Sequence, residues 1–197
     1  MKPGIFRTHV LAAVAAGVLL SGFANLAAAA STEEKRNEVR KMRSETLVKL
    51  YKVHPLAKGD LQKAVGYAVF SNIGVNLIFL SAAGGSGVAH NNRTGRDIYM
   101  KMVSGGIGLG LGVKDFRGIF VFSTDKAFKQ FTESGWSADA QADAAAKSGE
   151  KGGAAAGAIA VAPGVDLYQL TETGLALQAT IQGTKYYKDD ELNGNGK

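Results

Sequence analysis

Basic side chains at helical spacing are the residues of this chain best suited to do chemistry, and that chemistry is contact with phosphate groups. Residues 31–53 have the periodicity of an amphipathic helix with an apolar face formed by Val39, Met42, Thr46, Leu50 and Val53. Arg36, Arg40 and Arg43 border this face. A helix that lies among phosphate headgroups has this arrangement, and so does a surface helix that packs on a sheet. The two alternatives are compatible, because the apolar face can pack while the arginines still face phosphates.

Glycine-rich segments raise the question of nucleotide binding. Glycines at 106, 108, 110 and 112 alternate with aliphatic residues, and another strand-like segment follows them. A dinucleotide-binding motif instead has the spacing G-x-G-x-x-G between a strand and a helix, and a P-loop needs G-K-[ST], which the sequence lacks. We therefore do not expect nucleotide binding. The alternation predicts a strand with one bare face, which another sheet layer, an aromatic ring or a ligand approaches closely.

Candidate catalytic and metal-binding residues are few. His54 ends the first predicted helix, His90 lies in the predicted turn 90–93, and the sequence pairs neither imidazole with a partner. Ser86 lacks the second glycine of the G-x-S-x-G motif. Residues 189–194 resemble the first half of a calcium loop without its final glutamate, so we expect a solvated acidic tail. The sequence thus predicts no enzyme activity, no metal and no cofactor.

Residues 1–30 have the features of a secretory signal peptide. Basic residues precede an apolar core at 11–20 that is too short to span a bilayer, and Ala27–Ala30 offers a cleavage site before Ser31. Cleavage would lower the formal charge from +6 to +4 and leave 167 residues, the size of one domain. The chain has no cysteine, so neither a disulfide nor lipidation at a cysteine is possible. We expect export to the periplasm or cell envelope, peripheral to a membrane.

The rest of the chain predicts an α+β domain. Helices are expected over 31–53, with a capping box of Ser31 and Glu34, over 59–64, and over 124–133 after Ser123 or Thr124. Strands are expected over 67–71, 75–83, 86–91, 96–103, 106–113, 118–123, 136–146, 154–161, 165–171 and 174–183. The predicted fold is a curled antiparallel β-sheet or sandwich with an N-terminal amphipathic helix and one or two short helices. It forms a single domain over 31–193, with a disordered tail at 194–197.

The order of these pieces resembles the SYLF lipid-binding domain family. A glycine-rich strand pair precedes T-D-K-A-F-K-Q-F at 124–131, and G-W-S-A-D-A at 135–140 follows the helix. The segments A-V-G-Y-A-V-F at 64–70 and G-G-S-G-V at 84–88 are similar to the entry into the family's first strand and to its second strand. Gly174-Leu175, Gly183 and Tyr186-Tyr187 are similar to its closing strands. The resemblance covers roughly residues 33–193, and it rests on the order and spacing of the segments.

The resemblance implies a non-enzymatic protein that binds anionic phospholipid at a membrane surface. The residues expected to hold headgroup phosphates are Arg36, Arg40, Lys41, Arg43, Lys49, Lys58 and Lys63. Actin binding, a property of some eukaryotic members, is not expected of an exported protein. Nucleic acid is not expected either, because the sequence has no recognisable stacking platform or reading element. The alternative is an envelope structural or adhesive protein that binds a protein partner. The oligomeric state stays open.

Overall fold

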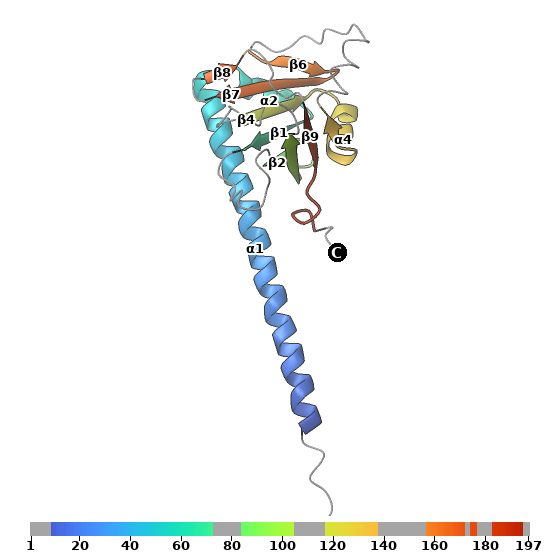
Figure 1. Cartoon of the computed structure of the whole chain (residues 1–197). Helices are drawn as coiled ribbons and strands as arrows, with labels where there is room; N and C mark the ends of the chain where they lie inside the picture. The colour runs from blue at the N-terminus through green and yellow to red at the C-terminus, as the bar shows by residue number, and fades with distance from the viewer. Residues whose placement is uncertain are drawn as a thin grey trace, which may run out of the picture.

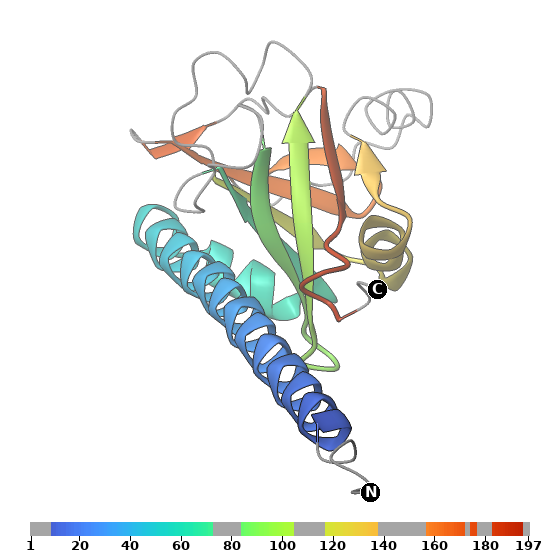
Figure 2. The same ribbon diagram turned by 60° about the horizontal axis from the view of Figure 1, so that its bottom comes forward.

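The computed structural model describes residues 9–72, 84–104, 117–137, 157–171, 174–176 and 183–194, with side chains from Ser31 onward. Helix α1 (His9–Val53) is a long rod whose N-terminal part projects beyond the rest of the molecule (Figure 1). Helix α2 (Ala57–Lys63) follows after a short turn, and helix α4 (Asp125–Glu133) lies on the other side of the sheet (Figure 2).

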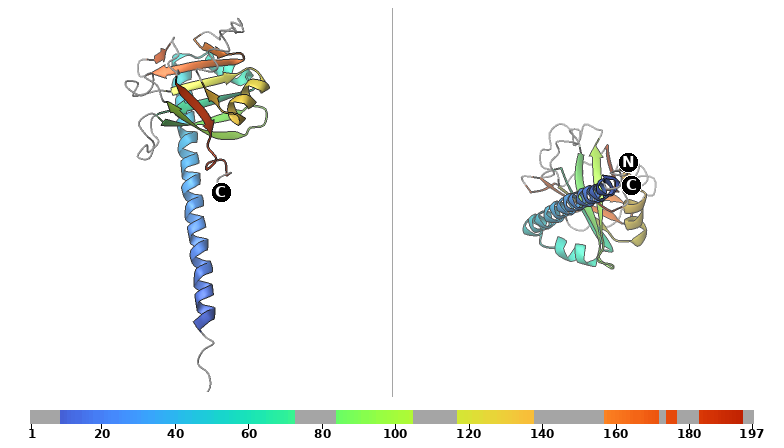
Figure 3. Two further views of the ribbon diagram at one scale, coloured as in Figure 1. Left: turned by 45° about the vertical axis from the view of Figure 1, so that its right-hand side comes forward. Right: turned by 90° about the horizontal axis from the view of Figure 1, so that it is seen from below.

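Nine strands among the described residues form one antiparallel sheet, in the order β5-β9-β3-β2-β1-β4-β7-β6 with β8 paired to β7. The strands are β1 (Gly66–Ser71), β2 (Gly84–Asn91), β3 (Asp97–Ser104), β4 (Arg117–Phe122), β5 (Trp136–Ser137), β6 (Ile159–Ala162), β7 (Val165–Thr171), β8 (Gly174–Ala176) and β9 (Thr184–Lys188). The sheet curls, with α1 and α2 against its outer face and α4 against its inner face (Figure 3). The predicted α+β class, with a curled antiparallel sheet and an N-terminal helix, is confirmed.

Side chains alternate along the strands, so the sheet has two buried faces of different character. On the outer face, strand residues such as Val69, Ile119 and Tyr168 pack against α1 and α2. On the inner face, aromatic rings from the sheet pack with those of α4; they are Phe70, Phe120, Phe122, Phe128, Phe131, Trp136 and Tyr186. The ring centroids of Phe70 and Tyr186 lie 4.8 Å apart with steeply inclined planes, an arrangement that stabilises aromatic pairs. Burial on both faces explains why β1 and β4 are almost continuously apolar.

Glycines in β2 make room for the side chains of the inner face. Gly87 lies opposite Phe70 in the pairing of β1 with β2, and the Phe70 ring covers the space that a Cβ at Gly87 would take. Met102 covers the corresponding space at Gly85. In this strand, therefore, glycine leaves a bare face so that large side chains can pack on it. The predicted strand over 106–113, where the same question arises, lies outside the described residues.

The helix boundaries agree with the sequence in α4 but not in α1. The Thr124 Oγ1 accepts a hydrogen bond from the Ala127 N–H at 3.2 Å, as expected of an N-cap. Helix α1 begins at His9, so Ser31 lies inside it. The prediction that a helix begins at Ser31 is therefore wrong for the uncleaved chain, because the helix continues through the preceding alanine-rich residues, which favour helix. Cleavage before Ser31 stays a prediction.

Strand boundaries differ most in the C-terminal third. Strand β9 (Thr184–Lys188) was not among the predicted strands, although its tyrosines belong to the SYLF resemblance. The predicted strands 136–146 and 174–183 are described only at β5 and β8, and the predicted strand 75–83 lies outside the described residues. Along the part of the chain that the structure describes, none of the helices is long and apolar enough to cross a membrane.

Candidate functional site on helices α1 and α2

The apolar face of α1 packs on the sheet. Val39, Thr46 and Leu50 are buried, and Met42 packs beside them, as the helical periodicity predicted. Val53 is an exception, since it is 46% exposed at the end of the helix. The arginine row, which we define as Arg36, Arg40 and Arg43, lies along the seam between α1 and strand β3.

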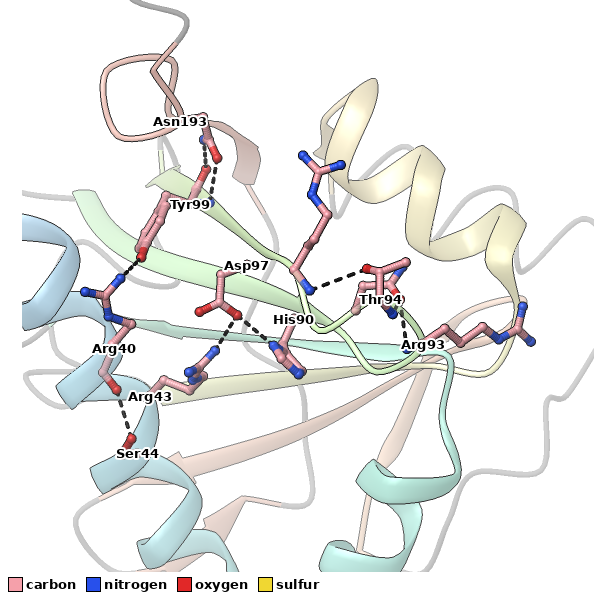
Figure 4. A network of polar contacts seen from close by, with 11 residues as sticks. Arg40, Arg43, Ser44, His90, Arg93, Thr94, Asp97, Tyr99 and Asn193 are labelled. Atoms are coloured by element: carbon pink, nitrogen blue, oxygen red, sulfur yellow. Dashed lines mark hydrogen bonds and ion pairs between the residues drawn. The ribbon is translucent and has the colours of Figure 1, made fainter. Parts of the chain in front are cut away.

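Arg43 forms the most enclosed ion pair of this seam (Figure 4). Its Nη1 donates to Asp97 Oδ1 at 2.6 Å, and the two side chains are only 17% and 19% exposed. His90 Nδ1 lies 2.7 Å from the same oxygen, across the β2–β3 pairing. His90 therefore lies in β2, as the predicted strand 86–91 indicated, and not in the turn predicted over 90–93; its partner Asp97 was not identified from the sequence. The third member of the trio with Asp97 and His90 is the Arg43 guanidinium, which stays protonated at neutral pH and is not a nucleophile. We therefore interpret the trio as an attachment of α1 to the sheet.

Arg40 and Arg36 contact the same tyrosine of β3. The Arg40 Nη1 donates to the Tyr99 hydroxyl at 2.6 Å (Figure 4). The Arg40 Nη2 lies 2.5 Å from Glu33 Oε1. The Arg36 guanidinium lies 5.8 Å from the centre of the Tyr99 ring, and its Nε donates to the Leu192 carbonyl at 2.8 Å. All three arginines of the row are thus held by groups of the domain itself.

The C-terminal segment, residues 189–194, covers the N-terminal half of this seam. Leu192 is 5% exposed and packs in one cluster with α1, β2 and β3. The Asn193 side chain accepts a hydrogen bond from the Tyr99 N–H at 3.1 Å and donates to the Tyr99 carbonyl at 2.7 Å. Asp189 is buried. The predicted solvated acidic tail is therefore wrong for these residues, because an apolar side chain and an amide anchor them to the sheet.

Exposed ion pairs add to the attachment of α1. The Lys35 Nζ lies 2.6 Å from Glu191 Oε1, and this contact lowers the pKa of Glu191 and raises that of Lys35. Hydrogen bonds from Arg40 and then Arg36 lower the pKa of Glu33. Pairs as exposed as these each contribute little to the free energy of unfolding. They orient the helix more than they stabilise it.

The predicted lysines of the site have different surroundings from the arginine row. Lys58 and Lys63 are exposed on α2 and form no ion pair within the described residues. Lys41 is exposed and lies 3.9 Å from Glu45, a loose contact on the helix surface. Lys49 is half-buried and has a partner. The structure therefore does not bring the seven predicted residues together on one surface.

Exposed apolar side chains are concentrated in the sequence around the end of α1. Among the described residues, four large apolar side chains are exposed, and three of them, Val48, Val53 and Leu56, lie here. Val48 and Leu56 are 68% and 69% exposed. We define the α1–α2 corner as the exposed apolar and lysine side chains from the last turns of α1 to the end of α2: Val48, Lys52, Val53, Leu56, Lys58 and Lys63.

Sequence reasoning assigned only two residues of this corner, Lys58 and Lys63, to the site. The other four were not counted as site residues: Val48, Lys52, Val53 and Leu56. A signal exists for Val48, since helical spacing places it on the polar side of α1, where a large apolar residue gains nothing from packing. Leu56 follows Pro55 in a turn, and the sequence does not show whether such a residue packs or stands in solvent.

A second group of titratable side chains fastens α2 to the sheet. The Tyr168 hydroxyl donates to Asp60 Oδ2 at 2.7 Å, and burial first, then Asp60, raises the pKa of Tyr168. Burial, with Asp60 nearby, also raises the pKa of Asp166. The His54 ring lies 5.7 Å from Tyr168, and its Nε2 is buried without a hydrogen-bond partner in the described part. The described residues contain no group of three or more side chains that could hold a metal ion.

Comparison with known proteins gives one informative similarity. No family model matches the chain. Beta cell expansion factor A from Aeromonas veronii is 34% identical to it over 162 residues. The alignment covers 82% of this chain and 60% of the relative, so the chain spans about three fifths of that protein's length. The two proteins share most of the present domain, and the relative has further sequence of its own.

Proposed function

We propose that this chain is an exported, non-enzymatic SYLF domain protein that binds anionic phospholipid at a membrane surface through the α1–α2 corner. One observation carries the choice of surface. Val48 lies one helical turn from Lys52, Leu56 lies two residues from Lys58, all four side chains are exposed, and neither lysine has a carboxylate partner among the described residues. An apolar patch rimmed by polar groups is typical of an interaction surface, and apolar anchors flanked by lysines are typical of proteins that lie on anionic membranes.

The energies support reversible binding. A lysine near an anionic membrane contributes on the order of 1 kcal/mol. Full burial of a leucine or valine side chain contributes about 1.5–3 kcal/mol, and shallow insertion of Val48 and Leu56 would supply part of this. Lys52, Lys58 and Lys63 with two apolar anchors therefore suffice for a peripheral contact. Salt should weaken this contact, because the electrostatic screening length falls to about 3 Å at 1 M salt.

The arginine row receives a different role in this proposal. Arg36, Arg40 and Arg43 were predicted to hold headgroup phosphates, but each already contacts a carboxylate, a hydroxyl or a carbonyl of the domain. Reaching a lipid phosphate would require them to give up these contacts. We therefore assign the first contact with the membrane to the lysines, and to the arginines the task of holding α1 in place.

The test is flotation of the purified protein with vesicles. We expect binding to phosphatidylglycerol vesicles at about 0.1 M salt, weaker binding at 1 M, and little binding to phosphatidylcholine. The double variant Lys52→Gln with Lys58→Gln should weaken binding roughly 30-fold, since two lysines contribute about 2 kcal/mol. The matched control is Lys126→Gln with Lys185→Gln, which removes two exposed lysines elsewhere on the domain.

Two results would contradict the proposal. Equal binding to anionic and neutral vesicles at both salts would remove the electrostatic contact. Equal loss in both double variants would mean that net charge, and not the corner, attracts the protein. An absence of vesicle binding would favour the alternative, an envelope structural or adhesive protein whose corner docks on a protein partner.

A second candidate function comes from the relative. The name of the Aeromonas veronii protein denotes an effect on beta cells, and the shared region includes most of this domain. An exported domain that binds membranes is compatible with such an effect. The test is the addition of the full chain to cultured beta cells, with cell number as the readout and the Lys52→Gln, Lys58→Gln variant beside it. An unchanged cell number would restrict that activity to the relative.

A further inference from the structure

A cavity of about 350 Å³ lies between the turn that joins β2 to β3, helix α4 and the end of β9. Its apolar floor is formed by Phe128, which is buried, and by Ile98, which packs on the inner core. Thr132 is also buried, and its hydroxyl already donates to the Phe128 carbonyl at 2.9 Å. The walls are polar, so the cavity has a small apolar base and a charged rim.

Three cations from three different elements line this rim. Arg96 comes from the turn, Lys129 from α4 and Lys188 from β9. None of the three side chains has an ion pair or hydrogen bond within the described residues. Lys101, one strand away, shows the contrast, since it pairs with the buried Asp189 at 3.1 Å. Three like charges around one cavity repel one another, and an anionic guest would relieve that repulsion.

The carboxylates that line the cavity do not balance these charges. They are Asp97 and Glu133. Asp97 Oδ1 already contacts Arg43 and His90, so much of its charge is neutralised from the α1 side. Glu133 has no ion pair in the described part of the chain. The rim is therefore net positive, and the Thr94 hydroxyl adds a neutral hydrogen-bonding group.

We propose that this cavity binds a small molecule that carries a phosphomonoester. Such a group has nearly two negative charges at neutral pH and three acceptor oxygens, which suits a cavity lined by three cations. The volume lies at the lower end of the range for small-molecule sites, about 300–1,000 Å³, so the carbon part of the ligand is short. None of the lining residues belongs to the α1–α2 corner, so this site is independent of the proposed membrane contact.

The test is a calorimetric titration of the full chain with glycerol 3-phosphate and, separately, with inorganic phosphate. Lys129→Gln and Lys188→Gln should each weaken binding about tenfold or more, because each removes a charge-assisted hydrogen bond. Glu133→Gln should strengthen binding several-fold, a gain that misfolding cannot imitate. Lys126→Gln is the matched control, because it removes a lysine of the same helix that does not line this cavity.

Vesicles distinguish a soluble ligand from a lipid headgroup. Phosphatidate vesicles present a phosphomonoester, and phosphatidylglycerol vesicles present only a phosphodiester. If Lys188→Gln and Glu133→Gln change binding to glycerol 3-phosphate alone, the ligand is soluble; if they change binding to phosphatidate alone, it is a headgroup. If these variants change neither, the site does not exist. Lys52→Gln with Lys58→Gln should leave glycerol 3-phosphate binding unchanged, so the two proposals fail separately.

Discussion

Basic residues occur near both ends of the part of α1 whose side chains are described, from Ser31 to Val53, but their surroundings differ. The arginine row is held by the sheet and by the C-terminal segment, and Leu192 is buried against the helix. Lys52 and Lys58 have no carboxylate partner in the described part, and Leu56 is exposed. A basic amphipathic pattern in the sequence therefore does not say which basic residues reach a partner. The partner is decided by what the rest of the chain places beside each turn of the helix.

Truncating a leucine that contacts each end of this helix segment should give the largest difference in the free energy of unfolding. Leu192→Ala should lower the free energy of unfolding by about 2–4 kcal/mol, because it empties a packed site between α1 and the sheet. Leu56→Ala should change it by less than about 0.5 kcal/mol, since the side chain is exposed. Chemical denaturation measures both. A similar loss in the two variants would mean that the corner is packed in solution and that the contrast between the ends is wrong.

Basic residues at a buried and an exposed position give the next difference. Arg43→Gln should lower the free energy of unfolding by about 1–3 kcal/mol, because, of its partners among the described residues, Asp97 keeps His90 alone in a poorly exposed site. Lys41→Gln, two residues away, should have an effect below about 0.5 kcal/mol. Thermal melts of the two variants decide the matter. Equal melts would show that Arg43 is free in solution and available to phosphate, as the sequence alone suggested.

The variant Tyr99→Phe separates the contribution of the Tyr99 hydroxyl from that of its ring. Tyr99→Phe removes the acceptor of the Arg40 hydrogen bond but keeps the ring beneath Arg36 and beside Leu192. We expect a loss of about 0.5–1.5 kcal/mol in the free energy of unfolding, the usual value of one hydrogen bond. Denaturation in parallel with Arg40→Gln gives the coupling of the two groups. If the losses simply add, the Arg40 to Tyr99 contact contributes nothing in solution.

Much of the fold could be predicted because local patterns determine it. The strands around Val69, Tyr99 and Ile119, the N-cap at Thr124 and the buried face of α1 all follow from periodicity and capping. The pairing of His90 with Asp97 was within reach too, since the predicted strands 86–91 and 96–103 are joined by a short turn. If these two strands form a hairpin, their antiparallel pairing places His90 opposite Asp97.

The rest depended on contacts between distant parts of the chain. Leu192 and Arg36 are 156 positions apart, and no local pattern shows that a polar C-terminal segment folds back on the first helix. The same holds for the cavity lined by Arg96, Lys129 and Lys188, whose residues come from three separate elements. Charges brought together by topology are invisible to motif reasoning, so the candidate site was predicted by residue type but not by partner.

Acid gives the smallest expected difference between the two ends. Glu33 and Glu191 have lowered pKa values in the folded protein because Arg40 and Lys35 contact them. Their contribution is therefore present above the unfolded value of about 4.3 and is lost as the pH falls through the lower, folded values. Below about pH 4, the N-terminal half of the seam should loosen while the corner does not change.

Amide signals followed by NMR during an acid titration measure this difference. Residues 33–43 should shift or broaden before residues 48–58, and high salt should mimic part of the effect, because both pairs are exposed. Glu191→Gln is the control, since it removes one of the two carboxylates and should leave only the response that Glu33 causes. If both ends of α1 change together at one pH, the helix leaves the sheet as a unit. Its attachment is then set by the buried contacts of Leu192 and Arg43 and not by the exposed pairs.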